Sequence, residues 1–178
     1  MMKTFILMVS MLFSVTSAVA QTNYYTTSKT FYETGYTYQC DHDGGVGIIL
    51  YNKNNRLTYV DQLYNDTGEN YVMPEGVDVL EYETWTDPKA DSIVRNAFSM
   101  VERQRLKGYR FNINMRINPN TGKVDEVDFW FMASTPYTTI PISVYRKIEV
   151  DIKKYLWFVP TEEGKKINYI YRWLFIRL

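Results

Sequence analysis

Side chains that many enzyme sites require are scarce in this sequence. Its 178 residues include one cysteine, Cys40, and one histidine, His42. A single cysteine excludes a disulfide within the chain, and any Ser–His or Cys–His mechanism would have to use His42. The glycine cluster at 44–47 opens onto a predicted strand rather than a helix, so it lacks the amide cradle of a phosphate loop. We therefore expect no cofactor.

An excess of one charge sign is also absent. The chain has 20 Lys and Arg residues against 20 Asp and Glu residues, so its formal net charge is zero. A protein that binds nucleic acid generally needs a basic face to neutralise phosphates. We therefore expect no nucleic-acid partner.

The amino terminus has the three parts of a secretory signal peptide. Lys3 precedes an apolar block over 4–13, and the block is followed by Ala18-Val19-Ala20. The block is shorter than the roughly 20 residues that span a bilayer, so we expect cleavage after Ala20 and no transmembrane helix in the mature chain. The sequence thus predicts an exported protein of the periplasm, outer envelope or extracellular space, with residues 1–20 removed.

Short strand signals separated by turns fill residues 21–86. The run 30–40 alternates in part and is interrupted by a glycine. The runs 46–51 and 56–62 flank turn-forming residues at 52–55, a pattern typical of a β-hairpin. The sequence therefore predicts a β-rich amino-terminal part.

The second half begins with a clear helix pattern. Asp87 can cap the helix, Pro88 suits its first position, and apolar residues recur at three- and four-residue steps up to a stop at Gly108. We therefore predict one helix over 88–107.

Two alternating runs follow, with turn-forming residues between them. They cover 111–117 and 126–131. Alternation gives each predicted strand one apolar face and one polar face. We expect the polar members, Glu126 and Asp128 among them, to face water.

A second helix is predicted from 143 to 156. Either Ser143 caps this helix, or it starts at Thr139 with Pro141. The last run, 167–178, is apolar on both faces. We therefore expect it to be a strand that is covered on both sides.

The order helix–strand–strand–helix–strand predicts an α+β fold with two helices on one face of an antiparallel sheet. Placing the last strand beside the first keeps the sheet antiparallel, in the order second, first, last. The amino-terminal strands are expected to extend this sheet or to cover its open face. We therefore predict a single domain over 21–178, with a β-rich part at 21–86 and an α-β-β-α-β part at 87–178.

Two stretches of the second half resemble the TonB C-terminal domain. They are Phe111–Val124, with its Asn-Pro-Asn-Thr-Gly turn, and Leu156–Lys165, with its aromatic-Val-Pro segment. The resemblance covers about 87–178 and implies the same α+β unit. It also implies contact with a protein or peptide that adds an extended segment to a sheet edge.

Most of the mature chain resembles a family of small exported proteins of Bacteroides-type anaerobes, known as a domain of unknown function. The stretches that carry this resemblance are 93–99, 102–108, 139–149 and 157–166. The resemblance implies a Gram-negative envelope setting and supplies no catalytic or binding residue.

Few residues are candidates for chemistry or binding. Cys40 and His42 would share a face of a strand, and Asp43 adds a third potential ligand for a transition metal. Trp85 and Trp130 could contact a glycan or a protein through exposed rings. Neighbouring positions alone do not make a coordination or catalytic geometry, so we assign no catalytic, metal-binding or cofactor-binding residue.

Three functions remain open at this point. The first is a non-enzymatic module of the cell envelope that binds a protein or peptide through a sheet edge. The second is a surface module that binds a glycan through Tyr and Trp side chains. The third is a small secreted hydrolase that uses His42 or an acidic pair such as Glu81 and Glu83.

Overall fold

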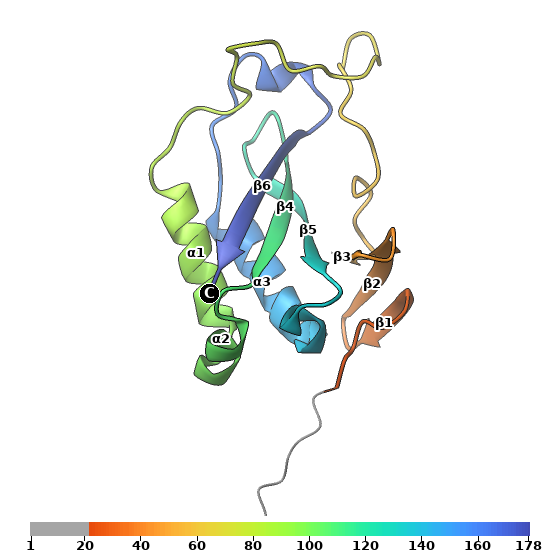
Figure 1. The fold of residues 1–178 in the computed structure, drawn as a ribbon. Helices are drawn as coiled ribbons and strands as arrows, with labels where there is room; N and C mark the ends of the chain where they lie inside the picture. The colour runs from red at the N-terminus through yellow and green to blue at the C-terminus, as the bar shows by residue number, and fades with distance from the viewer. Residues whose placement is uncertain (1–21) are drawn as a thin grey trace, which may run out of the picture.

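The computed structural model describes residues 22–178, so the predicted signal peptide lies outside the described residues (Figure 1). The strands are β1 (Lys29–Glu33), β2 (Tyr36–Asp43), β3 (Gly47–Asn52), β4 (Arg110–Ile117), β5 (Val124–Met132) and β6 (Ile170–Arg177). The α-helices are α1 (Thr86–Ala97), α2 (Met100–Leu106) and α3 (Ile142–Tyr155). No helix within 22–178 is long and apolar enough to cross a membrane.

All six strands form one antiparallel sheet in the order β1-β2-β3-β5-β4-β6. The predicted α+β class is confirmed, and so is the predicted order of the last three strands, because β4 lies between β5 and β6. The amino-terminal strands extend the sheet through the pairing of β3 with β5. Strands from both halves of the sequence therefore share one sheet.

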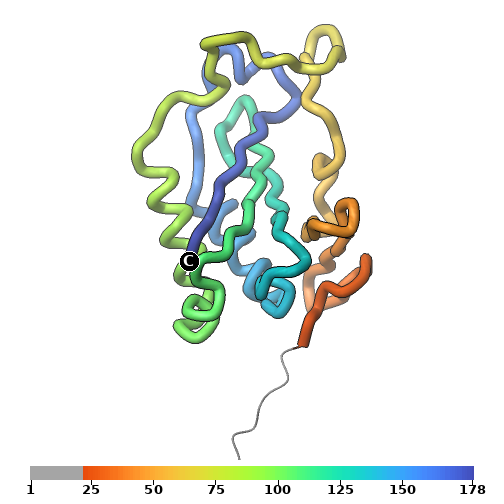
Figure 2. The backbone as a smooth tube through the Cα atoms, in the orientation of Figure 1, coloured from red at the N-terminus to blue at the C-terminus, as the bar shows by residue number. Residues whose placement is uncertain are grey.

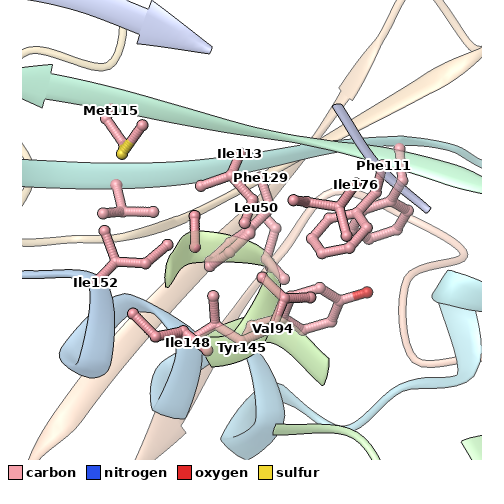
Figure 3. Packing of buried hydrophobic residues seen from close by; sticks show 14 of the residues in the cluster. Leu50, Val94, Phe111, Ile113, Met115, Phe129, Tyr145, Ile148, Ile152 and Ile176 are labelled. Atoms are coloured by element: carbon pink, nitrogen blue, oxygen red, sulfur yellow. The ribbon is translucent and has the colours of Figure 1, made fainter. Parts of the chain in front are cut away.

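The helices pack against one face of this sheet (Figures 1 and 2). An aromatic core is buried between the helices and the sheet. Tyr145 of α3 is fully buried, stacks on Phe131 with ring centroids 5.5 Å apart, and donates its hydroxyl to the Tyr137 carbonyl at 2.9 Å. Buried tyrosines need such partners, because an unpaired hydroxyl in the core is costly. The core residues labelled in Figure 3 are Leu50, Val94, Phe111, Ile113, Met115, Phe129, Tyr145, Ile148, Ile152 and Ile176.

A buried carboxylate joins α3 to the amino-terminal strands. Glu149 of α3 is 1% exposed and accepts hydrogen bonds from the Tyr38 hydroxyl and from Asn52 Nδ2. Arg146 Nη1 lies 2.8 Å from the same carboxylate and supplies a positive charge. This cluster gives β2 and β3 a polar attachment to the helix in addition to their apolar contacts.

The prediction of one helix over 88–107 is wrong, because the chain breaks between α1 and α2. Ser99 adopts an extended conformation and starts a new helix with a capping box. Its hydroxyl accepts the Glu102 N–H at 3.2 Å, and the Glu102 carboxylate accepts the Ser99 N–H at 2.7 Å. These reciprocal bonds satisfy donors that a continuous helix would use internally, and they favour the break. Asp87 lies in the first turn of α1 rather than at its cap.

The predicted hairpin of 46–51 with 56–62 is also wrong. β3 pairs with β2 instead, and no strand forms over 56–62. The Glu126 carboxylate accepts the backbone N–H groups of Arg56 at 2.7 Å and Leu57 at 2.9 Å. A carboxylate on the open face of the sheet therefore takes the backbone donors that a hairpin would have used.

The prediction that the polar residues of β4 and β5 face water is wrong. Asp128 is 1% exposed and forms an ion pair with Arg116, while Asn114 Nδ2 donates to the Asp128 carboxylate at 2.6 Å. Arg116 Nη2 also donates to the Thr58 carbonyl at 2.9 Å. The segment 56–62 crosses this face and shields the charged side chains from water. The charged side chains in turn bind the backbone of the segment.

The last two elements differ in detail from their predictions. The N-cap position of α3 is occupied by Pro141, and Ser143 lies inside the helix. β6 is shorter than the predicted strand and is covered on one face alone, since Trp173 is 51% and Phe175 56% exposed on the other. Cover on both sides was expected because both faces of this strand are apolar. The amino-terminal strands β1–β3 instead extend the sheet beyond β5, at the edge opposite to β6, and do not cover β6.

We predict that Arg116→Met destabilises the protein by about 3–5 kcal/mol, because it leaves the buried Asp128 carboxylate without its counter-charge. The free energy of unfolding from urea titrations measures this loss. The double variant Arg116→Met/Asp128→Leu should recover much of it, because no uncompensated charge remains. A double variant as unstable as the single one would contradict the role given to the ion pair.

Candidate functional site

Cys40 and His42 both lie in β2, as their spacing suggested, but they do not form a reactive pair. Cys40 is fully buried, and burial raises the pKa of its thiol to about 11. At neutral pH the thiol therefore keeps its proton and is a poor nucleophile. The His42 ring is used elsewhere, because its Nε2 lies 3.1 Å from the Tyr25 carbonyl oxygen.

Asp43 and Trp130 are brought together by the pairing of the amino-terminal strands with β5. The Trp130 indole N–H donates to the Asp43 carboxylate at 3.2 Å. The ring packs over Gly47, where an added Cβ atom would lie 2.5 Å from the indole nitrogen. Within 22–178, no group of three or more His, Cys, Asp or Glu side chains could hold a metal ion.

Trp85 belongs to a different surface. It precedes α1, is half-buried, and packs against Trp157 with ring centroids 4.4 Å apart. The two tryptophans singled out from the sequence, Trp85 and Trp130, therefore do not share one binding surface.

Asp41 is a polar centre that sequence reasoning missed. Its carboxylate accepts hydrogen bonds from the hydroxyls of Tyr59 at 2.7 Å and Tyr51 at 2.9 Å, and from Gln39 Nε2 at 2.7 Å. Burial by itself would raise the pKa of Asp41, but these bonds outweigh burial and hold that pKa below its ordinary value. The cluster ties the segment 56–62 to β2 and β3.

The open edge of β6 is the most prominent unpaired feature of the sheet. β6 pairs with β4 on one side and has no strand on the other within the described residues. The Arg177 carbonyl accepts a hydrogen bond from Arg95 Nη2 at 2.9 Å, so it points away from β4. In an antiparallel strand, alternate residues direct their backbone groups to the same side, so those of Tyr171, Trp173 and Phe175 also point to the open edge.

A groove runs between this edge and α1. It has a volume of about 350 Å³ and is lined by Asp87 and Asp91 of α1 and by residues 172–176. Asp87 accepts a hydrogen bond from Arg172 at 2.6 Å, which fixes one end of the strand beside the helix. An extended chain that paired with β6 would lie along this groove.

Two aromatic rings flank the groove on the outer face of the sheet. Trp173 and Phe175 are about half exposed, and their centroids are 4.5 Å apart. The two rings share a face because they are two residues apart in a strand. The acidic wall of the groove was not predictable from the sequence. Asp87 is placed beside β6 by its bond to Arg172, which lies 85 positions later in the chain.

We predict that Asp41→Asn lowers the free energy of unfolding at neutral pH by about 1 kcal/mol, because a charged acceptor is lost. Since folding lowers the pKa of Asp41, the wild-type carboxylate stabilises the protein above its ordinary pKa and loses this effect as pH falls. The gap between wild type and variant should therefore close between about pH 5 and pH 3. Urea titrations at each pH measure it, with Asp66→Asn as an exposed control. A gap that did not change with pH would contradict this role.

Comparison with known proteins identifies the family. A family model described as "Domain of unknown function (DUF5043)" matches residues 21–173. A crystal structure of a DUF5043 family protein from Bacteroides uniformis ATCC 8492 is 41% identical in sequence, with a TM-score of 0.82 over 88% of this chain and 94% of that chain. No curated protein matches the chain. The chain belongs to the DUF5043 family.

Proposed function

We propose that this protein is an exported, non-enzymatic module of the cell envelope that binds an extended segment of a protein or peptide partner. The segment adds to the sheet as a further strand beside β6. The observation that carries the proposal is the unpaired edge of β6, which presents the backbone groups of Tyr171, Trp173 and Phe175. Main-chain hydrogen bonds to such an edge supply affinity, and neighbouring side chains supply specificity.

The surroundings of the edge support strand addition. The groove of about 350 Å³ between α1 and β6 lies where an added chain would run, and the helix supplies a wall on one side. On the other side Trp173 and Phe175 offer exposed apolar area. Cross-strand contact with aromatic side chains stabilises a paired strand beyond its backbone bonds.

The geometry gives less support to the two alternatives. Glycan binding through Trp85 or Trp130 would require freely exposed rings, but Trp85 packs against Trp157 and Trp130 packs over Gly47. A hydrolase built on His42 would require a nearby nucleophile, and the Cys40 thiol is buried with a raised pKa. Peptide binding at the β6 edge is therefore the function that we favour.

Strand addition should protect particular backbone amides from hydrogen exchange. Linear peptides are first selected from a random display library on the intact protein. We predict that a selected peptide slows exchange at Tyr171, Trp173 and Phe175, whose N–H groups face the open edge, by at least about tenfold. Exchange measured by NMR should change little at Arg172 and Leu174, whose N–H groups already pair with β4. Selection of no peptide, or protection confined to other regions, would overturn the proposal.

A pair of variants separates the backbone contribution from the side chain. Phe175→Pro removes one outward N–H and should abolish peptide binding, because proline cannot donate to a new strand. Phe175→Ala keeps that N–H and should only weaken binding. Equal loss in both variants would indicate that the ring, rather than the strand edge, binds the peptide.

Export is supported by the match between the family model and the predicted cleavage site. The part of the chain that matches the family model begins at residue 21, directly after Ala20. We predict that the protein expressed with its own amino terminus in a Bacteroides host is recovered outside the cytoplasm and starts at Gln21. Cell fractionation and mass spectrometry of the amino-terminal peptide measure both features. An intact Met1 in the cytoplasmic fraction would contradict export.

A further inference from the structure

We propose that the segment that binds β6 alternates in chemistry, with apolar or aromatic side chains on one face and basic side chains on the other. This inference rests on the proposed function and specifies the partner of the same site. It follows from the different chemistry on the two sides of the β6 edge, the aromatic outer face and the acidic groove along α1.

Strand geometry determines which side chains of the added segment lie on each face of the sheet. Successive side chains of a strand point to opposite faces, and a strand added to a sheet continues its pleat. Every second side chain of the segment therefore lies on the outer face beside Trp173 and Phe175. The intervening side chains lie on the helix side, above the groove wall formed by Asp87 and Asp91.

The outer side of the edge favours apolar side chains. Trp173 and Phe175 contact each other edge to face, and each keeps more than half of its surface exposed. The central residues of β6, 173–176, carry no charge. An aromatic or aliphatic side chain on the added strand would cover this exposed area by cross-strand contact.

The helix side of the edge favours positive charge. A second hollow of about 390 Å³ adjoins the groove, because the ion pair of Asp87 with Arg172 lines both. Together the two hollows are lined by five carboxylates, those of Asp78, Glu81, Glu83, Asp87 and Asp91, against the single guanidinium of Arg172.

Ion pairing inside the molecule leaves part of this negative charge uncompensated. Asp87 is paired with Arg172 and Asp91 with Arg95, both at 2.6 Å. Glu81 and Glu83 make no ion pair among the described residues. Lysine or arginine side chains of a bound segment would be attracted to this wall, whereas acidic side chains would be repelled.

The sequences of selected peptides test this inference directly. A random linear peptide library displayed on phage is selected on the intact protein at low salt. Enriched peptides should carry Lys or Arg at positions that alternate with aromatic or aliphatic residues. Peptides that protect the β6 edge amides but show no basic enrichment would overturn the inference and leave the proposed function standing. Failure to enrich any peptide would instead overturn the proposed function.

A matched pair of variants tests the origin of the preference. Glu81→Gln/Glu83→Gln/Asp91→Asn removes three carboxylates from the acidic wall and should weaken binding of a selected basic peptide by about fivefold at low salt. Asp66→Asn/Glu69→Gln/Glu75→Gln removes the same charge from exposed positions outside the groove and should leave affinity unchanged. Isothermal titration calorimetry measures both. Equal weakening in the two variants would show a general charge effect and overturn the inference.

Discussion

Packing of the helices against a single face of the antiparallel sheet is the constraint on which the rest of this structure depends. That face is buried by an aromatic core in which the hydroxyls of Tyr25, Tyr38 and Tyr145 find backbone or carboxylate partners. The opposite face has no helix among the described elements, so it must be stabilised in another way. Arg116 and Glu126 provide that stabilisation by binding the segment 56–62 across the sheet, and Asp128 supplies the counter-charge of Arg116.

The cover supplied by this segment is incomplete, and its limits define the candidate site. The segment is attached through Asp41 of β2, through Glu126 of β5, and through Tyr169, which precedes β6 and donates its hydroxyl to the Val60 carbonyl at 2.6 Å. It therefore meets only the start of β6, and Trp173 and Phe175 further along the strand stay exposed. The surface proposed to bind a partner is thus the part of the sheet that the chain's own helices and loops leave uncovered.

The sequence predicted the features that depend on local patterns. Alternation located β4 and β5, turn residues located the loop between them, and antiparallel pairing fixed the order of the last three strands. It failed where a distant partner decides the outcome. Glu126 and Asp128 follow the pattern of solvent-facing residues, but their partners lie as far away as Arg56, 70 positions earlier. The groove wall at Asp87 depends on α1 lying beside β6, and no local pattern reports that contact.

The two edges of the sheet differ in a way that bears on function. β1 is five residues long and has a charge at each end, Lys29 and Glu33, which are common protections for an exposed edge. β6 is eight residues long, and between its two charges, Arg172 and Arg177, it has an uncharged run at 173–176 with two exposed aromatic rings. A longer unpaired edge with exposed apolar side chains promotes association with other chains. An exposed edge of this kind carries a risk of unwanted association for a monomer. A protein that receives a strand from a partner requires such an edge.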